Sequence, residues 1–258
     1  MLIIYFVVAL FATVIGAIAG IGGGVIIKPV LDLLGTYDAS TISVLSSFTV
    51  FAMAISSVIK QLKSEVKLKF GIAVPIAIGS VFGGWLGDNL FGLVLRNTSD
   101  QIITIIQNVI MIIMLSFILI YMFKQTKKIA MPVSNKVFIL AIGVFLGTVS
   151  SFLSIGGGPM NICILMFFFL MDTKEAARNS ILIIVFTQMS SITSMFMSGK
   201  LNNIQFDVLP LMIVGGILGG IIGSHLQKKM TPNDVTKLFN LVVIGLIVIN
   251  IINIIKIC

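Results

Sequence analysis

A short glycine cluster occurs twice in this chain, and each copy interrupts a long apolar run. Residues 20–24 read GIGGG and residues 154–158 read SIGGG, an offset of 134 that is close to half of the 258 residues. Consecutive glycines break an α-helix and leave backbone N–H groups unpaired. Inside a membrane-length apolar segment, such backbone is tolerated only where it is buried in protein or lines a cavity. The pattern therefore predicts a site built from two related halves.

Composition places the chain in a membrane. It is 58% hydrophobic and 10% charged, with a mean hydropathy of +1.16, whereas soluble domains carry roughly 25% charged residues. Apolar stretches of about 20 residues, enough to cross the hydrocarbon core as a helix, recur along the chain. We predict an all-α integral membrane protein with about eight transmembrane helices, near residues 2–20, 41–59, 70–92, 102–123, 136–153, 179–198, 205–226 and 237–255.

Two shorter apolar stretches, near 25–34 and 159–171, follow the glycine clusters. At roughly 10 residues each is too short to span the bilayer and is predicted to be a half-helix. Each half of the chain then holds a glycine-broken first span, its half-helix and three further spans. Because four spans are an even number, we expect the halves to share one orientation, related by an axis along the membrane normal.

Polar residues outside the glycine clusters repeat at the same offset. Asp38 matches Asp172, Ser46 matches Ser180, and each aspartate is expected to cap the helix that follows it. With about two single-residue insertions, the glycines at 83, 84 and 87 align with those at 219, 220 and 223. The matches predict a first transmembrane repeat at residues 1–123, a basic cytoplasmic linker at 124–136 and a second repeat at 137–258.

Basic residues are concentrated in the loops near 60–69 and 124–136. Two predicted spans separate these loops, so both lie on one side, and the positive-inside rule makes that side cytoplasmic. Both termini are then expected to be cytoplasmic. The basic loop near 228–237 falls on the outer side in this scheme and argues against it.

Each half-helix start offers free N–H donors and an effective positive charge of roughly half a unit, an arrangement that binds anions. We therefore predict that a small anion binds at the two clusters, at Gly22, Gly23, Gly24, Gly156, Gly157 and Gly158. Close helix packing is the alternative role for glycines, and it suits those at 79, 83, 84, 87, 215, 216, 219, 220 and 223 better.

Backbone donors alone would not replace the hydration of an anion, because each hydrogen bond to a charged group returns only about 1.5–3 kcal/mol. Nearby polar residues are candidate further donors: Ser46, Ser154, Ser180, Asn161, Asn179 and Gln188. Lys28 faces either the cavity or the membrane interface. Arg178 either attracts the anion or forms an ion pair with Glu175.

Several function classes are excluded by the residues present. The net charge of +8 is distributed in loops and does not indicate nucleic-acid binding. One histidine, two distant cysteines and the lack of paired carboxylates argue against a membrane enzyme, a metal site or a cofactor. The expected partners are a small anionic substrate and the lipid bilayer, and a homodimer is compatible with the sequence.

The duplicated order of glycine break, half-helix, polar helix start around Ser46 or Ser180, and proline-plus-glycine span resembles the TauE/SafE family of sulfite exporters over roughly residues 5–255. This resemblance implies a bacterial inner-membrane transporter of sulfite, sulfonates or related anions, with its site at the glycine clusters. We expect a secondary transporter. An anion channel that uses the same helix ends is the alternative.

Overall fold

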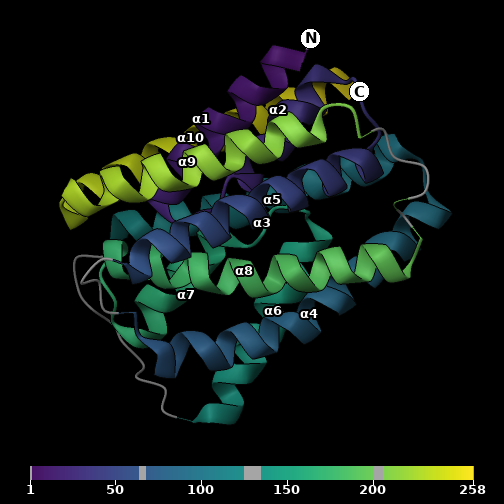
Figure 1. Ribbon diagram of the computed structural model, residues 1–258. Coiled ribbons are helices and arrows are strands. Elements are labelled where there is room, and N and C mark those ends of the chain that lie inside the picture. Colours follow the sequence, from purple (N-terminus) through teal and green to yellow (C-terminus); the bar gives the residue numbers. More distant parts are fainter. Residues whose placement is uncertain (1, 64–67, 125–134, 200, 202–205, 258) are drawn as a thin grey trace.

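The computed structural model describes residues 2–63, 68–124, 135–199, 201 and 206–257. The predicted linker at 124–136 therefore falls mostly outside the described residues. Within them the chain forms ten helices (Figure 1): α1 (Leu2–Ala19), α2 (Gly24–Leu34), α3 (Ala39–Leu62), α4 (Phe70–Asn97), α5 (Asp100–Lys124), α6 (Lys136–Phe152), α7 (Gly158–Phe169), α8 (Thr173–Met197), α9 (Leu209–Lys229) and α10 (Pro232–Ile257).

The predicted all-α membrane architecture is confirmed. Seven described helices are long and apolar enough to cross a membrane, and the 17-residue α6 is just shorter. Large apolar side chains cover the outside, among them Phe117 at 69% exposure and Leu241 at 68%. Such a surface needs a lipid surrounding. The half-helices after the glycine clusters, α2 and α7, are 11 and 12 residues long, as predicted.

Glycines set the direction of the packed helices. Along α1 and α9 the contacts advance together, with Gly215 against Phe6, Gly219 against Thr13 and Gly223 against Ala17. Along α3 and α9 they advance in the same sense, with Gly216 against Thr49 and Gly220 against Met53. Helices α1, α3 and α9 therefore run in one direction.

Because α1 and α3 point the same way, α2 must carry the chain back between them. The rings of Tyr5, near the start of α1, and Tyr37, after the end of α2, are 5.6 Å apart. The second half repeats this arrangement. Helix α4 runs parallel to α6, because Gly79 contacts Leu140 and Gly87 contacts Thr148. It also runs parallel to α8, because Lys69 bonds Asn179 and Val81 bonds Ser190. Helices α6 and α8 therefore point the same way, and α7 must carry the chain back between them. Each glycine break is thus the turn of a helical hairpin.

The hairpins reverse one sequence prediction. A hairpin returns the chain to its starting side, so each half makes three net crossings, through α3 to α5 and through α8 to α10. Three is odd, and the two halves are therefore inverted relative to one another. The expectation of equal orientation about the membrane normal is wrong, because it counted the broken first span as a crossing.

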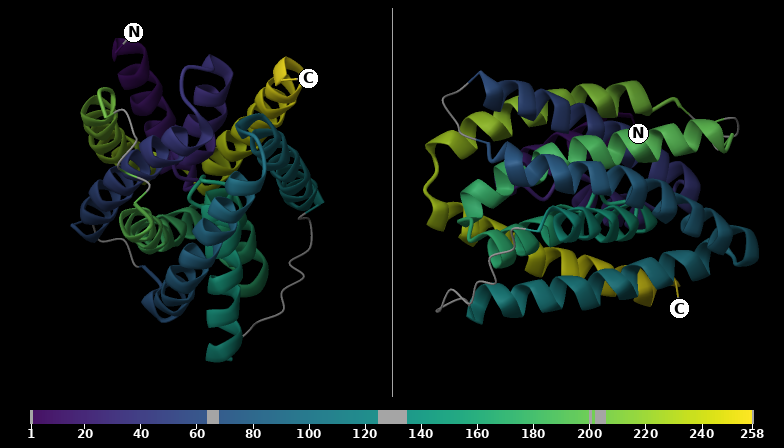
Figure 2. Two further views of the ribbon diagram at one scale, coloured as in Figure 1. Left: turned by 90° about the vertical axis from the view of Figure 1, so that its right-hand side faces the viewer. Right: turned by 90° about the horizontal axis from the view of Figure 1, so that it is seen from below.

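The charges separate between the two ends of the bundle. We call the end where α3 and α5 finish the basic end. The described basic residues there are Lys60, Lys63, Lys69, Lys124, Lys136, Lys174, Arg178, Lys228, Lys229 and Lys237. The opposite end has Lys28, Arg96 and Lys256, and the chain begins and finishes there (Figures 1 and 2). The termini therefore lie at the end opposite the basic loops. The prediction that the termini and the basic loops lie on the same side is wrong. The loop near 228–237, which seemed to break the charge rule, obeys it.

Cysteine labelling tests this topology. In a chain with both native cysteines replaced by serine, we expect Lys63→Cys and Lys229→Cys to react with an impermeant maleimide from one side of the membrane. Thr36→Cys should react from the other side only. An eight-span arrangement would place positions 63 and 229 on opposite sides, and that labelling pattern would refute the hairpins.

Candidate functional site: two crossed glycine breaks

The turn of each hairpin depends on left-handed backbone. Gly20 and Gly22 have φ of 74° and 72°, and Gly156 and Gly157 have 76° and 78°. L-residues with a Cβ rarely adopt this region, so glycine is the residue that fits. Ser154 holds φ of 58° at the position that corresponds to Gly20. The turns are buried, as the sequence predicted for unpaired backbone in a membrane.

The two breaks lie against each other in the middle of the protein. A Cβ on Gly24 would be 2.8 Å from the carbonyl oxygen of Ile155, and a Cβ on Gly158 would overlap the carbonyl group of Ile21. These two contacts are equivalent, because Gly24 corresponds to Gly158 and Ile21 to Ile155 at the offset of 134. The starts of α2 and α7 therefore meet, and they belong to half-helices that run toward opposite ends of the bundle.

A local two-fold relation extends around this crossing. Val50 at the midpoint of α3 and Ile184 at the midpoint of α8 both adjoin Gly22 and Gly156. Gly20 packs against Ala177, and at the equivalent contact the hydroxyl of Ser43 donates to that of Ser154 at 2.8 Å. Gly20 corresponds to Ser154 and Ser43 to Ala177 at the offset of 134, so the crossing lies on the axis that relates the halves.

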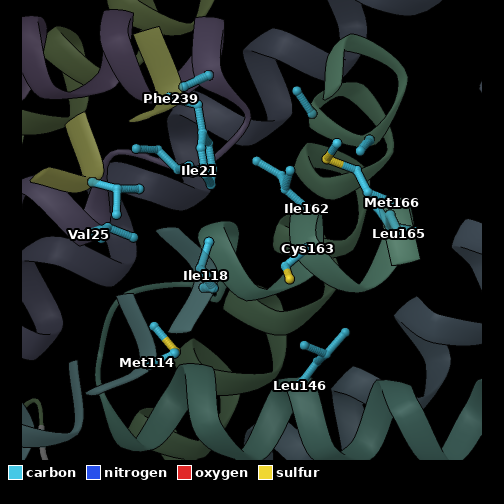
Figure 3. Close-up of a cluster of buried hydrophobic side chains, with 14 of the residues drawn as sticks. Ile21, Val25, Met114, Ile118, Leu146, Ile162, Cys163, Leu165, Met166 and Phe239 are labelled. Atoms are coloured by element: carbon cyan, nitrogen blue, oxygen red, sulfur yellow. The ribbon is translucent and has the colours of Figure 1, made fainter. Parts of the chain in front are cut away.

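Apolar side chains surround the crossing on one side. Figure 3 shows Ile21 and Val25 of the first break, Ile162 and Cys163 of α7, and Phe239 of α10 in one buried cluster. Cys163 is a free, buried thiol in this packing. The cluster keeps water from the break and raises the strength of any electrostatic interaction there.

The crossing carries hydrogen-bond donors that have no partner. The N–H groups of Gly24 and Val25 at the start of α2, and of Gly157 and Gly158 at the start of α7, find no acceptor among the described residues. A buried unpaired N–H costs free energy. Unpaired donors at two helix starts that meet are suited to an oxyanion with several acceptor oxygens.

Two buried amides add to these donors. Asn161, in the first turn of α7, has both side-chain polar atoms unpaired and is 1% exposed. Nε2 of Gln188 is also unpaired, and a Cβ on Gly156 would be only 2.8 Å from it. Because buried polar groups are almost always paired, these two amides are candidates to bind a ligand.

The predicted serines have different surroundings. Ser46 lies beside Gly24 and donates to the carbonyl oxygen of Ser154 at 3.4 Å. The hydroxyl of Ser180, its counterpart, is buried without a partner. Ser46 therefore supports the crossing directly, whereas Ser180 retains an unused donor.

Two other predicted residues, Asn179 and Arg178, lie elsewhere. Asn179 accepts from the backbone N–H of Lys69 at 2.9 Å and so joins the starts of α8 and α4. Arg178 donates to Gln227 at 3.4 Å at the basic end. Its proposed partner Glu175 is instead paired with Lys69 at 3.2 Å. Neither Asn179 nor Arg178 is brought to the glycines.

Lys28 has a role that neither sequence interpretation foresaw. It is buried in α2, and its Nζ lies 2.9 Å from Asp32 of the same helix, with side-chain exposures of 2% and 3%. An ammonium inside a membrane helix must be paired or hydrated, and the spacing of four residues brings the carboxylate to it. Asp32 was the missing partner, and this spacing was the available signal.

The described residues contain no group of three or more His, Cys, Asp or Glu side chains that could hold a metal ion. The donors at the crossing, which are backbone N–H groups and side-chain amides, are neutral.

Inverted halves, paired half-helices that meet in the membrane, and neutral donors at their starts together define the architecture of a membrane transport protein. The sequence profile described as Sulfite exporter TauE/SafE matches residues 5–250. The chain therefore belongs to the TauE/SafE family, which is a family of membrane transporters. It is 25% identical over 265 residues to the probable membrane transporter protein YunE of Bacillus subtilis (strain 168), covering 94% of each chain. No solved structure matches it.

Proposed function

We propose that this protein is a secondary transporter of a small sulfur-containing oxyanion or organic anion, such as sulfite or a sulfonate, in the bacterial cell membrane. The anion binds where the half-helices α2 and α7 meet. The observation that carries this proposal is the set of unpaired donors at that point, the four backbone N–H groups with Asn161 and Gln188.

Neutral donors suit a carrier. Each hydrogen bond to the anion contributes about 1.5–3 kcal/mol, and several together offset the loss of hydration without holding the anion irreversibly. A charged partner in this dry centre would bind more strongly and slow release. The donor set thus favours exchange of the anion over its storage.

Inverted repeats favour a carrier over an anion channel. Two halves of opposite orientation around one central site give two related states, one open to each side, when one half moves against the other. In this proposal residues 1–123 and 137–258 are the two moving repeats, joined by the segment 124–136. By the positive-inside rule the basic end faces the cytoplasm and both termini face outward.

Thermal stabilisation across a panel of anions tests the substrate class. Purified protein is heated with sulfite, thiosulfate, sulfate, taurine, sulfoacetate or chloride. A ligand at 100 times its dissociation constant stabilises by about 2.7 kcal/mol, a readily measured shift. We expect one sulfur anion to stabilise selectively. Equal responses to all anions, or none, would contradict the proposed substrate class.

A further inference from the structure

A cavity of about 220 Å³ at the basic end is lined mainly by basic residues. Lys60 and Lys63 come from the end of α3, Arg178 from the start of α8, and His225 and Lys228 from the end of α9. We propose that this cavity, the basic pocket, is a second anion site that captures the transported oxyanion and delivers it to the central crossing. The delivery role rests on the proposed function, whereas the binding site does not.

The lysines and the arginine of the basic pocket are not taken up by the described ion pairs. The ion pairs among the described residues are Lys28 with Asp32 and Lys69 with Glu175, and neither involves a lining residue. Ser224 also lines the cavity, and its hydroxyl is buried without a partner. A guanidinium, ammonium groups and a hydroxyl that face one hollow match an oxyanion of two charges and several oxygens.

The repeat provides an internal comparison. Helix α4 packs against α8 as α9 packs against α3, and each pair joins one helix from each half. At an offset of 134, Ser194 corresponds to Lys60 and Val44 to Arg178. At an offset of 136, the counterparts of Ser224, His225 and Lys228 are Asp88, Asn89 and Gly92. None of these is a cation. The same helix packing is therefore built without positive charge at the other end, and the fold alone does not require the basic pocket.

The basic pocket adjoins the first glycine break. Arg178 donates to Oε1 of Gln227, and Nε2 of Gln227 donates to the carbonyl oxygen of Ile18 at 2.8 Å, near the end of α1. The neighbouring Ala177 packs against Gly20. An anion held in the basic pocket is thus beside the hairpin turn that leads to the central crossing.

Calorimetric titration of sulfite into the full chain, in nanodiscs of neutral phosphatidylcholine, tests the proposal. We expect two anions to bind wild-type protein. Arg178→Gln with Lys228→Gln should weaken one of them at least tenfold and increasingly at low salt, as expected for a charged, partly exposed site. Lys229→Gln removes a neighbouring charge that does not line the cavity, and it is the matched control that should leave both sites unchanged.

A variant of the central site separates the two proposals. Asn161→Leu with Gln188→Leu should remove the other anion and leave the basic pocket intact. If wild type binds one anion and only this variant loses it, the basic pocket is overturned and the central site stands. If wild type binds one anion and only the Arg178→Gln with Lys228→Gln variant loses it, the central site is overturned and the basic pocket stands. No sulfite binding would overturn both.

The lipid composition distinguishes a free anion from a headgroup. We expect sulfite to bind the basic pocket equally in neutral nanodiscs and in nanodiscs with phosphatidylglycerol. Loss of this site in the anionic nanodiscs would assign the pocket to a lipid phosphate and overturn its role in delivery.

Discussion

Gly158→Ala is expected to abolish transport and most of the folded protein. A Cβ at this position would overlap the carbonyl group of Ile21, which is backbone of the other hairpin and cannot rotate away. Overpacking of a buried site typically costs 1–3 kcal/mol and occasionally more, and separation of the two breaks would add the loss of their shared packing. We expect a loss of about 4 kcal/mol or more in unfolding free energy.

A graded series makes this prediction specific. Gly24→Ala places a Cβ 2.8 Å from the carbonyl oxygen of Ile155, so its effect should have the same sign and be smaller. Gly245→Ala in α10 meets nothing within 4 Å and should leave stability unchanged or slightly raised, since alanine favours a helix. Thermal unfolding and transport are measured for all three. Equal stability of the Gly158 and Gly245 variants would contradict the close crossing.

Lys28→Met is expected to destabilise the protein strongly, by about 3–5 kcal/mol, because it leaves the carboxylate of Asp32 buried without its partner. Lys28→Met with Asp32→Leu should recover most of the loss, since replacing a buried ion pair by apolar side chains is often neutral or stabilising. The free energy of unfolding of wild type, both single variants and the double variant forms the test.

Additive losses in the double variant would show that Lys28 and Asp32 do not act as a pair. Lys136→Met, at an exposed position of the basic end, is a control for the removal of a lysine charge and should change stability little.

The sequence predicted the helices and their breaks well, because apolar length and consecutive glycines act locally. The starts of α2 and α7 at Gly24 and Gly158 follow directly from the glycine clusters. The predicted helix caps hold in part: the side chain of Asp172 accepts from the N–H of Glu175, whereas Asp38 occupies its cap position without such a bond.

The direction of the half-helices could not be predicted, because a stretch of roughly 10 apolar residues is short whether it continues across the membrane or turns back. The deciding contacts are long-range, such as Tyr5 against Tyr37 and the advance of α9 along α1. Because each half-helix turns back, each half crosses the membrane three times and not four. The termini therefore lie on the side opposite the basic loops. A local break in the chain was readable, but its global consequence was not.

Which of the predicted polar side chains lie beside the glycines could be predicted only in part, for a similar reason. Asn161 and Gln188 lie beside the glycines with unpaired amides, as expected of donors to a ligand. Asn179 has the same side chain, yet it lies nine residues before Gln188 on α8, and its amide is used to join α4. Position along the helix, which depends on how α8 crosses α3 and α4, decides which amide reaches the crossing.

The central claim is that the crossed glycine breaks bind the transported anion. Its most direct test is uptake of radiolabelled sulfite into proteoliposomes by wild type, by Asn161→Leu with Gln188→Leu, and by Thr193→Val as a control on α8. Loss of two hydrogen bonds to the anion, each worth about 1.5–3 kcal/mol, predicts at least a 100-fold fall in kcat/KM for the double variant. The control should transport normally. Unchanged uptake by a folded double variant would contradict the account.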